Sequence, residues 1–70
     1  MDIERINKKN EELKHKPAYT FKKNGRKHDI IFDNTVVFIT SADFDVVRDL
    51  VHKFNAAYFE GWLQRERESE

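Results

Sequence analysis

The sequence predicts a small α+β domain: a short N-terminal helix, a three-stranded antiparallel β-meander, and a long C-terminal helix packed on one sheet face. Three observations predict this order. Three short runs rich in β-branched and aromatic residues are separated by two tight-turn pairs. One long stretch then carries apolar residues at spacings of three and four. Seventy residues suffice for a single domain, residues 1–70, and no more.

The first element is predicted to be an amphipathic helix over residues 2–15. Ile3, Ile6 and Leu13 fall on one narrow face at helical spacing. So few apolar residues do not stabilise an isolated helix, so we expect this helix to dock or to fray. Pro17 ends it, because proline disfavours the helical conformation at the residue before it.

The strands follow, joined by two-residue turns. Asn24-Gly25 predicts a type I′ hairpin turn, because both central residues of that turn need positive φ. Asp33-Asn34 predicts a second tight turn. The predicted strands are residues 18–23, 26–32 and 35–39.

Turns of this length fix which side chains share a sheet face. With the turns above, Phe21 is expected opposite His28, and Ile30 opposite Val37. The core face would then carry Tyr19, Phe21, His28, Ile30, Phe32, Val37 and Ile39. The outer face would still hold three apolar side chains, those of Ile31, Val36 and Phe38.

The last element is predicted to be a helix over residues 41–67. Thr40 or Ser41 can cap its free N–H groups, and Asp43 can reach back to complete a capping box. Gly61 lies on the apolar stripe, which suggests that another backbone or ring approaches closely there. The stripe expected to face the sheet is Phe44, Val47, Leu50, Val51, Phe54, Tyr58, Gly61 and Trp62.

Two apolar surfaces remain without a predicted cover. The first is the outer-face group of Ile31, Val36 and Phe38. The second is the pair Phe59 and Leu63, because the 26 residues 42–67 of this helix span about 39 Å whereas such strands span about 17–20 Å. The N-terminal helix can cover one of these surfaces, so we expect at least one of them to bind a partner or a second copy.

Charge divides the chain into two halves. Lysine and arginine total 13, as do aspartate and glutamate, so net charge is zero, but the first 28 residues are basic and the rest acidic. Lys22, Lys23, Arg26 and Lys27 surround the first turn. They can neutralise DNA phosphates from a β-ribbon, or they can form a solvated turn that protects the sheet edge.

The long helix carries acidic residues on one outer quadrant. Asp45, Asp49 and Glu60 lie there, with Lys53 between them. Such a face can complement the basic groove of a nucleic-acid-binding protein. The alternative is an ordinary solvated helix face.

Catalytic and metal-binding patterns are missing from the sequence. It has no cysteine, and His15, His28 and His52 are not at metal-ligand spacing. It has no nucleophile elbow, and two glycines do not make a phosphate-cradling loop. We therefore expect a non-enzymatic protein without a cofactor. The first residues lack signal-peptide character and no run is long enough to span a membrane, which favours a cytoplasmic location, that of the host cell if the gene is carried by a phage.

One local motif resembles a known family. The run Phe54-Asn55-Ala56-Ala57-Tyr58-Phe59-Glu60-Gly61-Trp62-Leu63-Gln64 is similar to a segment of small phage-encoded anti-CRISPR proteins that inhibit type II-A Cas9. The element order is similar over most of the chain. The resemblance implies an inhibitor that binds a CRISPR effector nuclease. The similar inhibitor is strongly acidic and mimics DNA, whereas this chain is neutral with a basic first half.

These observations lead to one main hypothesis and two alternatives. The main hypothesis is a protein-binding inhibitor, encoded by a phage or mobile element, that docks on a host defence protein such as a Cas9-type nuclease. Phe59 and Leu63 would be its apolar anchors, and Asp45, Asp49 and Glu60 its charged contacts. The alternatives are a small DNA-binding regulator that uses the basic hairpin, dimeric through Ile31, Val36 and Phe38, and a homo-oligomeric assembly subunit.

Overall fold

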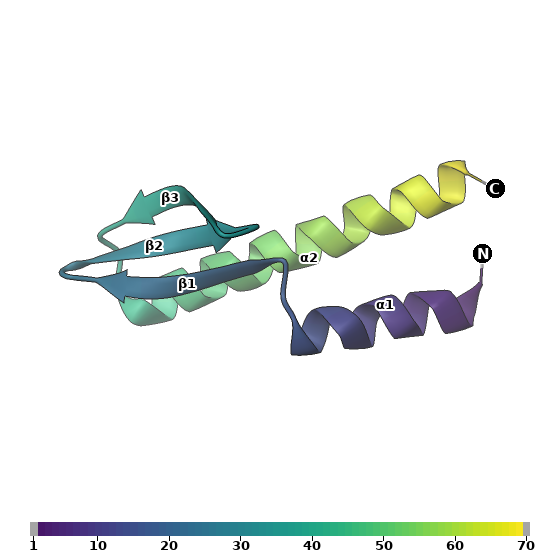
Figure 1. Ribbon diagram of the computed structural model, residues 1–70, viewed down its shortest axis with the longest axis horizontal. Helices are drawn as coiled ribbons and strands as arrows, with labels where there is room; N and C mark the ends of the chain where they lie inside the picture. The colour runs from purple at the N-terminus through teal and green to yellow at the C-terminus, as the bar shows by residue number, and fades with distance from the viewer. Residues whose placement is uncertain (1, 70) are drawn as a thin grey trace.

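The computed structural model describes residues 2–69 and has the predicted α+β architecture (Figure 1). The three strands form one antiparallel sheet in the order β1-β2-β3. The elements are α1 (Ile3–His15), β1 (Tyr19–Asn24), β2 (Lys27–Phe32), β3 (Thr35–Thr40) and α2 (Phe44–Glu68).

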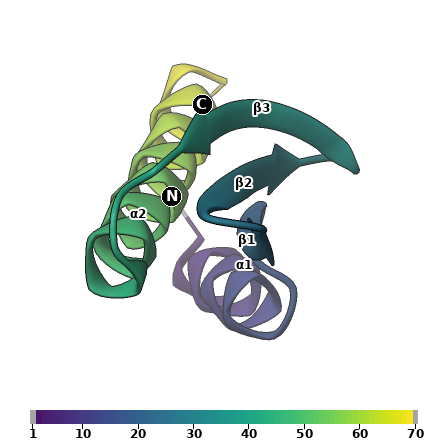
Figure 2. The same ribbon diagram turned by 90° about the vertical axis from the view of Figure 1, so that its left-hand side faces the viewer.

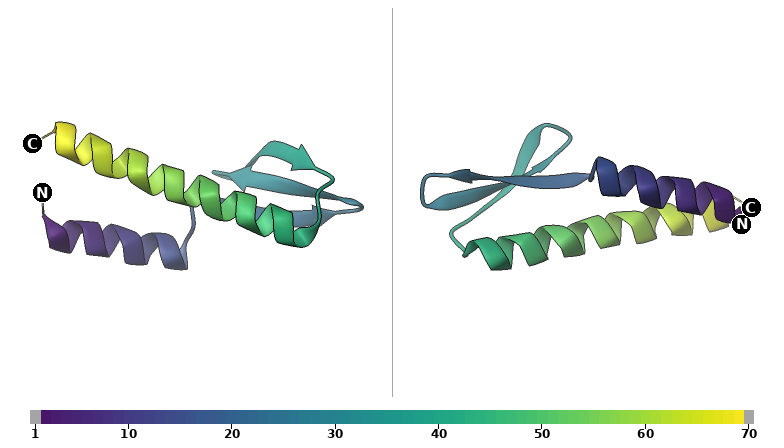
Figure 3. Two further views of the ribbon diagram at one scale, coloured as in Figure 1. Left: turned by 180° about the vertical axis from the view of Figure 1, so that it is seen from behind. Right: turned by 90° about the horizontal axis from the view of Figure 1, so that it is seen from below.

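The molecule is elongated, because α2 is much longer than the sheet. The first part of α2 lies along the sheet, and α1 lies beside its last part, so that the start of α1 and the end of α2 are at the same end of the molecule (Figures 1 and 3). The molecule measures 45 × 20 × 19 Å with a radius of gyration of 14.1 Å. A globular chain of this length has a radius of gyration of about 11 Å.

The first hairpin turns one residue later than the sequence predicts. Asn24 pairs with Lys27, so the two-residue turn is Gly25-Arg26 and not Asn24-Gly25. Within this turn only Gly25 has positive φ, at 64°, which is the pattern of a type II′ turn rather than type I′. The predicted pairing of Phe21 with His28 is therefore wrong, and Phe21 pairs with Ile30. The slip is two residues, so each side chain of β1 and β2 keeps its predicted face.

The second hairpin has the predicted turn but contains a β-bulge. Asp33 and Asn34 both have positive φ, at 51° and 62°, as a type I′ turn requires. Ile31 pairs with Val36, whereas Ile30 pairs with Phe38. Val37 is thus an extra residue on β3. The predicted pairing of Ile30 with Val37 is wrong because one inserted residue exchanges the two faces of the strand beyond it.

The hydrophobic core is small and lies between α2 and the first two strands. Ile30 and Val47 are 0% exposed and Val51 is 6% exposed. Most of the predicted core faces of β1, β2 and α2 are confirmed. Val37 and Ile39, expected in the core, are instead half-exposed or more. Side chains packed against the core are Tyr19, Phe21, Ala42, Leu50 and Phe54.

The start of α2 differs from the predicted capping box. The helix begins at Phe44, and the N-cap is Asp43, whose side chain makes no capping hydrogen bond. The hydroxyl of Thr40 accepts a hydrogen bond from the Ala42 N–H at 3.2 Å, so it is occupied within the preceding loop. The loop of residues 41–43 is extended enough to delay the helix by two to three residues.

A side-chain bridge ties the sheet to the middle of α2. The amide of Asn55 accepts a hydrogen bond from the Tyr19 N–H at 2.7 Å and donates one to the Tyr19 carbonyl at 3.1 Å. Tyr19 also packs its ring against Phe54, with centroids 5.3 Å apart. The bridge satisfies both backbone groups of Tyr19 at the start of β1, where the chain leaves α1.

The far end of the molecule is more loosely packed. No residue of α1 is buried, and Ile3 is 71% exposed. The Arg5 guanidinium forms an ion pair with Glu66 at 3.0 Å, and the Lys9 ammonium lies 5.8 Å from the centre of the Trp62 ring. A Cβ added at Gly61 would meet no atom within 4 Å, so the expected close approach at this glycine is wrong.

Candidate interaction surface

The edge strand β3 presents an apolar surface that no other element covers. The main contacts of α2 with the sheet are made to β1 and β2, and β3 is the curved edge strand beside β2 (Figure 2). Four consecutive side chains of β3 are therefore about half exposed. They are Val36 at 44%, Val37 at 50%, Phe38 at 50% and Ile39 at 56%, and we call them the β3 surface.

The two edges of the sheet differ in character. β1, one edge, includes Lys22 and Lys23, and lysines on an edge strand discourage pairing with other chains. β3, the other edge, contains no charged residue and no proline along its six residues. Its outward backbone groups have no strand beside them. Such an edge is a template for a further strand.

The predicted group of Ile31, Val36 and Phe38 is divided by the bulge. Ile31 and Val36 are direct partners and share the outer face, as expected. Phe38 pairs with Ile30 and shares its face. The prediction that all three lie together is wrong for Phe38. As the sequence predicts, β3 has apolar side chains on both of its faces.

The predicted anchors Phe59 and Leu63 lie beyond the sheet on the last part of α2. Both are partly buried. The Phe59 ring is stacked with Trp62, at 5.9 Å and an interplanar angle of 10°. Since α1 lies beside this part of α2 (Figure 3), the pair is a less open surface than β3.

The expected acidic face of α2 is balanced by neighbouring basic residues. Asp45 lies 3.7 Å from Arg48, and Asp49 lies 3.0 Å from Lys53. These side chains are well exposed, and Glu60 is exposed as well. The face is therefore a solvated mixture of both charges, in which each pair contributes little to stability.

The basic hairpin distributes its charges over two faces. Lys22 pairs with Asp29, whereas Lys23 pairs with His28, so the two lysines point to opposite sides of the ribbon. Arg26 lies in the turn and Lys27 begins β2. All four are exposed, but they do not line a single stripe that could follow one DNA groove.

The described chain contains neither a cluster of metal-binding side chains nor a helix suited to cross a membrane. Among residues 2–69, no group of three or more His, Asp or Glu side chains is arranged to hold a metal ion. Over the same residues, neither helix combines the length and apolar character needed to cross a bilayer.

Sequence reasoning missed two residues that matter for the architecture. Asn55 belongs to the motif of residues 54–64, and nothing in the sequence spacing predicts that its amide meets Tyr19. Asp29 is 5% exposed in the central strand, and its Oδ2 accepts a hydrogen bond from Asn24 at 3.2 Å. Its signal in the sequence is an acidic residue directly before the apolar run of Ile30, Ile31 and Phe32.

Comparisons of the chain with protein-family models, with curated proteins and with solved structures each found no match. The surfaces described above are therefore the basis for a functional proposal.

Proposed function

We propose that this chain is a non-enzymatic protein-binding module that docks through the β3 surface. The observation that carries the proposal is the exposure of four consecutive apolar side chains on an uncharged sheet edge. Contiguous apolar surface of this kind is characteristic of protein–protein contact sites. An incoming strand would pair with the β3 backbone, while pockets for alternate side chains would provide specificity.

The amount of exposed surface supports the same proposal. The chain exposes 5721 Å². A folded monomer of 8.4 kDa is expected to expose about 4,600 Å². The excess of about 1,100 Å² is comparable to the roughly 800 Å² that each partner buries in an interface of standard size.

The target we propose is a host defence protein, a Cas9-type CRISPR nuclease, and the effect is inhibition. Support for this target is the resemblance of residues 54–64 to anti-CRISPR proteins of type II-A systems. The charge-balanced face of α2 argues against mimicry of DNA by this chain. We therefore assign the main contact to β3 and a secondary one to Phe59 and Leu63.

A second candidate is a homo-oligomeric assembly subunit. It is favoured by the composition of β3, because a strand without charge pairs antiparallel with its own copy without repulsion. A two-fold axis through such a pair would join two sheets into one of six strands.

The experiment compares two lysine substitutions at valines of similar exposure. Val37→Lys places a charge on the β3 surface, where Val37 is 50% exposed. Val46→Lys places the same charge on α2, where Val46 is 55% exposed. Binding to purified type II-A Cas9 and its DNA cleavage are measured for each variant, and light scattering gives the oligomeric state. Circular dichroism verifies that both variants are folded.

The expected result is that Val37→Lys weakens binding at least about tenfold, since a buried unpaired charge is costly at an interface, while Val46→Lys binds like the unsubstituted chain. An unsubstituted chain that neither binds nor slows the nuclease excludes that target. If it is also monomeric, the assembly candidate fails too. Equal effects of the two substitutions would overturn the assignment to β3.

A further inference from the structure

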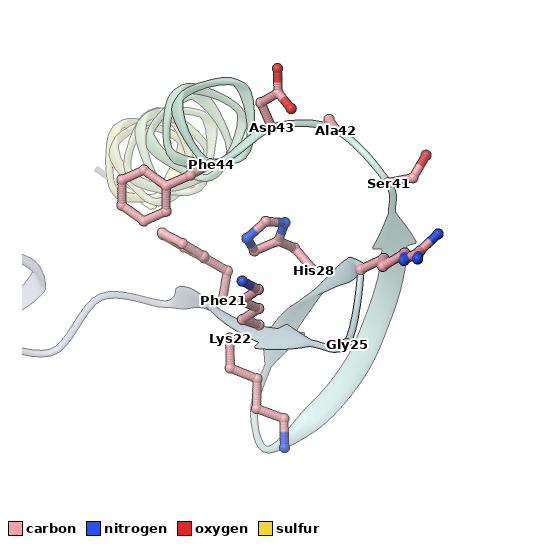
Figure 4. Close-up of a pocket in the computed structure, with 10 residues that line it drawn as sticks. Phe21, Lys22, Gly25, His28, Ser41, Ala42, Asp43 and Phe44 are labelled. Atoms are coloured by element: carbon pink, nitrogen blue, oxygen red, sulfur yellow. The ribbon is translucent and has the colours of Figure 1, made fainter.

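A cleft lies between the basic hairpin and the start of α2 (Figure 4). This part of the molecule is far from α1 and from the end of α2 (Figure 1). Its volume is about 650 Å³, within the range of small-molecule sites. The hairpin forms one wall with Lys23 and Gly25, and the loop before α2 forms the other with Ser41 and Ala42. The cleft takes no part in the proposed function, and the inference below does not depend on that function.

His28 is a buried side chain without a partner in this cleft. It is 9% exposed, and its Nδ1 is buried with no hydrogen-bond partner within residues 2–69. Figure 4 shows the ring directed into the space between Phe21 and the loop of residues 41–43. A buried polar group without a partner is costly, which makes it a good indicator of a missing ligand.

Lys23 adds a positive charge beside His28. The two residues are direct cross-strand partners, so their side chains lie on the same face of the hairpin. Among the described residues, no carboxylate lies within ion-pair distance of Lys23. Lys22 and Arg26 also line the cleft, so its hairpin wall is strongly basic.

The positive end of α2 faces the same cleft. The first helical hydrogen bond runs from the Val47 N–H to the Asp43 carbonyl. The N–H groups of Phe44, Asp45 and Val46 precede it and find no acceptor within the described chain, because the Asp43 side chain does not cap them. Free N–H groups and the helix dipole together attract anions.

We infer that this cleft binds a phosphate-type oxyanion. The anion would accept hydrogen bonds from the free N–H groups of α2 and from His28, and would form a charge-assisted contact with Lys23. The hairpin, the central strand and the start of α2 all contribute residues to the lining of this cleft. The phosphate we propose belongs to a free ion or a small phosphomonoester. A nucleic-acid backbone is the alternative source, which a parallel titration with a DNA duplex tests.

Two further features of the cleft refine the ligand. Phe21 and Phe44 lie side by side, with ring centroids 5.6 Å apart, and both line the cleft. An aromatic wall favours a ligand with a flat group next to its phosphate, as in a mononucleotide. Asp43 is the acidic residue of the lining, and Figure 4 shows its carboxylate directed away from His28.

The experiment titrates the full chain with inorganic phosphate, with adenosine monophosphate and with adenosine, and follows the amide signals of Phe44 to Val46 and the His28 ring by NMR. We expect both phosphates to shift these signals at millimolar concentration or below, and adenosine to leave them unchanged. Lys23→Gln is expected to weaken phosphate binding about tenfold, the value of one charge-assisted hydrogen bond.

The matched control is Lys27→Gln. It removes the same charge from a hairpin residue that does not line the cleft, and should change the affinity less than twofold. His28→Gln should also weaken binding, provided that circular dichroism shows the variant to be folded. Asp43→Asn should tighten binding, because it removes the acidic side chain of the lining.

Three outcomes would overturn the inference. One is equal weakening by Lys27→Gln and Lys23→Gln, which would indicate diffuse electrostatic attraction. Another is the absence of signal shifts at the start of α2 with both phosphates. The third is binding of a DNA duplex without any binding of the two small phosphates, which would indicate contact by the whole hairpin and not by the cleft.

Discussion

The two ends of this molecule share one helix but differ in how they are packed. In the sheet region, formed by the three strands and residues 44–58 of α2, the side chains of Ile30 and Val47 are fully buried. In the helical end, formed by α1 and residues 59–68 of α2, no described residue is buried. The apolar stripe of α2 continues through both regions. The difference shows that an apolar pattern on a helix produces a core only where a second layer lies against it.

The second layers themselves explain the difference. Over the sheet region, Val47 and Val51 of α2 meet Ile30 of the central strand, which has neighbours on both sides. At the helical end, α2 meets a single helix, and the polar contacts between them include an exposed ion pair and a cation–π contact. Such contacts contribute well below 1 kcal/mol when exposed, so the two regions should differ strongly in stability.

The largest expected effect comes from the same substitution made in each region. Ile30→Ala removes a side chain that is 0% exposed, and we expect the free energy of unfolding to fall by about 2–4 kcal/mol. Ile3→Ala removes one that is 71% exposed in α1, and a change within about 0.5 kcal/mol is expected. Urea denaturation followed by circular dichroism measures both. Similar losses for the two variants would mean that α1 is part of the same cooperative core.

An intermediate effect is expected at Asn55, close to where the two regions meet. Asn55→Ala leaves the Tyr19 N–H and carbonyl without their partners, which should cost about 1–3 kcal/mol. Asn55→Asp keeps the acceptor for the Tyr19 N–H but loses the donor to its carbonyl, so a smaller loss is expected. The same denaturation assay orders the variants, and an alanine variant as stable as the unsubstituted chain would show that solvent replaces both bonds without cost.

The smallest expected effect has the opposite sign. Gly61→Ala should stabilise α2 by about 0.5–1 kcal/mol, because an added Cβ meets no atom and the helix gains a better helix former. Its counterpart is Ala57→Gly, an exposed helical position in the sheet region, which should destabilise by a similar amount. Amide hydrogen exchange gives a sharper readout, because amides of the helical end should exchange by local opening. These amides should exchange more slowly in Gly61→Ala than in the unsubstituted chain. Faster exchange in Gly61→Ala would contradict the open surroundings of this residue.

The sequence was sufficient to predict those parts of the fold that depend on local chemistry. Element order follows from the turn pairs and the helical spacing, and the faces of β1 and β2 were predicted correctly although the first turn is displaced. A displacement of one residue in the turn shifts the pairing by two, and a shift of two preserves the alternation. The alternation of side chains in β1 and β2 can therefore be predicted even though the first turn is displaced.

The arrangement of β3 could not be predicted from the sequence. Nothing in the run of β-branched and aromatic residues before Thr40 shows which one is inserted, because Val36, Val37, Phe38 and Ile39 all suit a strand. Whether their side chains are covered depends on where α2 crosses the sheet, which is a property of the tertiary packing. The overhang beyond the sheet was predictable from lengths alone, whereas the more open apolar surface on β3 was not.

The contact of Tyr58 with Phe32, at 6.0 Å between ring centroids, is the last aromatic link between α2 and the sheet. Beyond it, the last ten residues of α2 extend for about 15 Å. If α2 tilted by about 10° at Tyr58, the end of the helix would move by about 2.6 Å over that length. The core contacts made by the residues before Tyr58 would stay in place. A small tilt of this end would therefore let α2 adapt to a bound surface without any loss of the core contacts between α2 and the sheet.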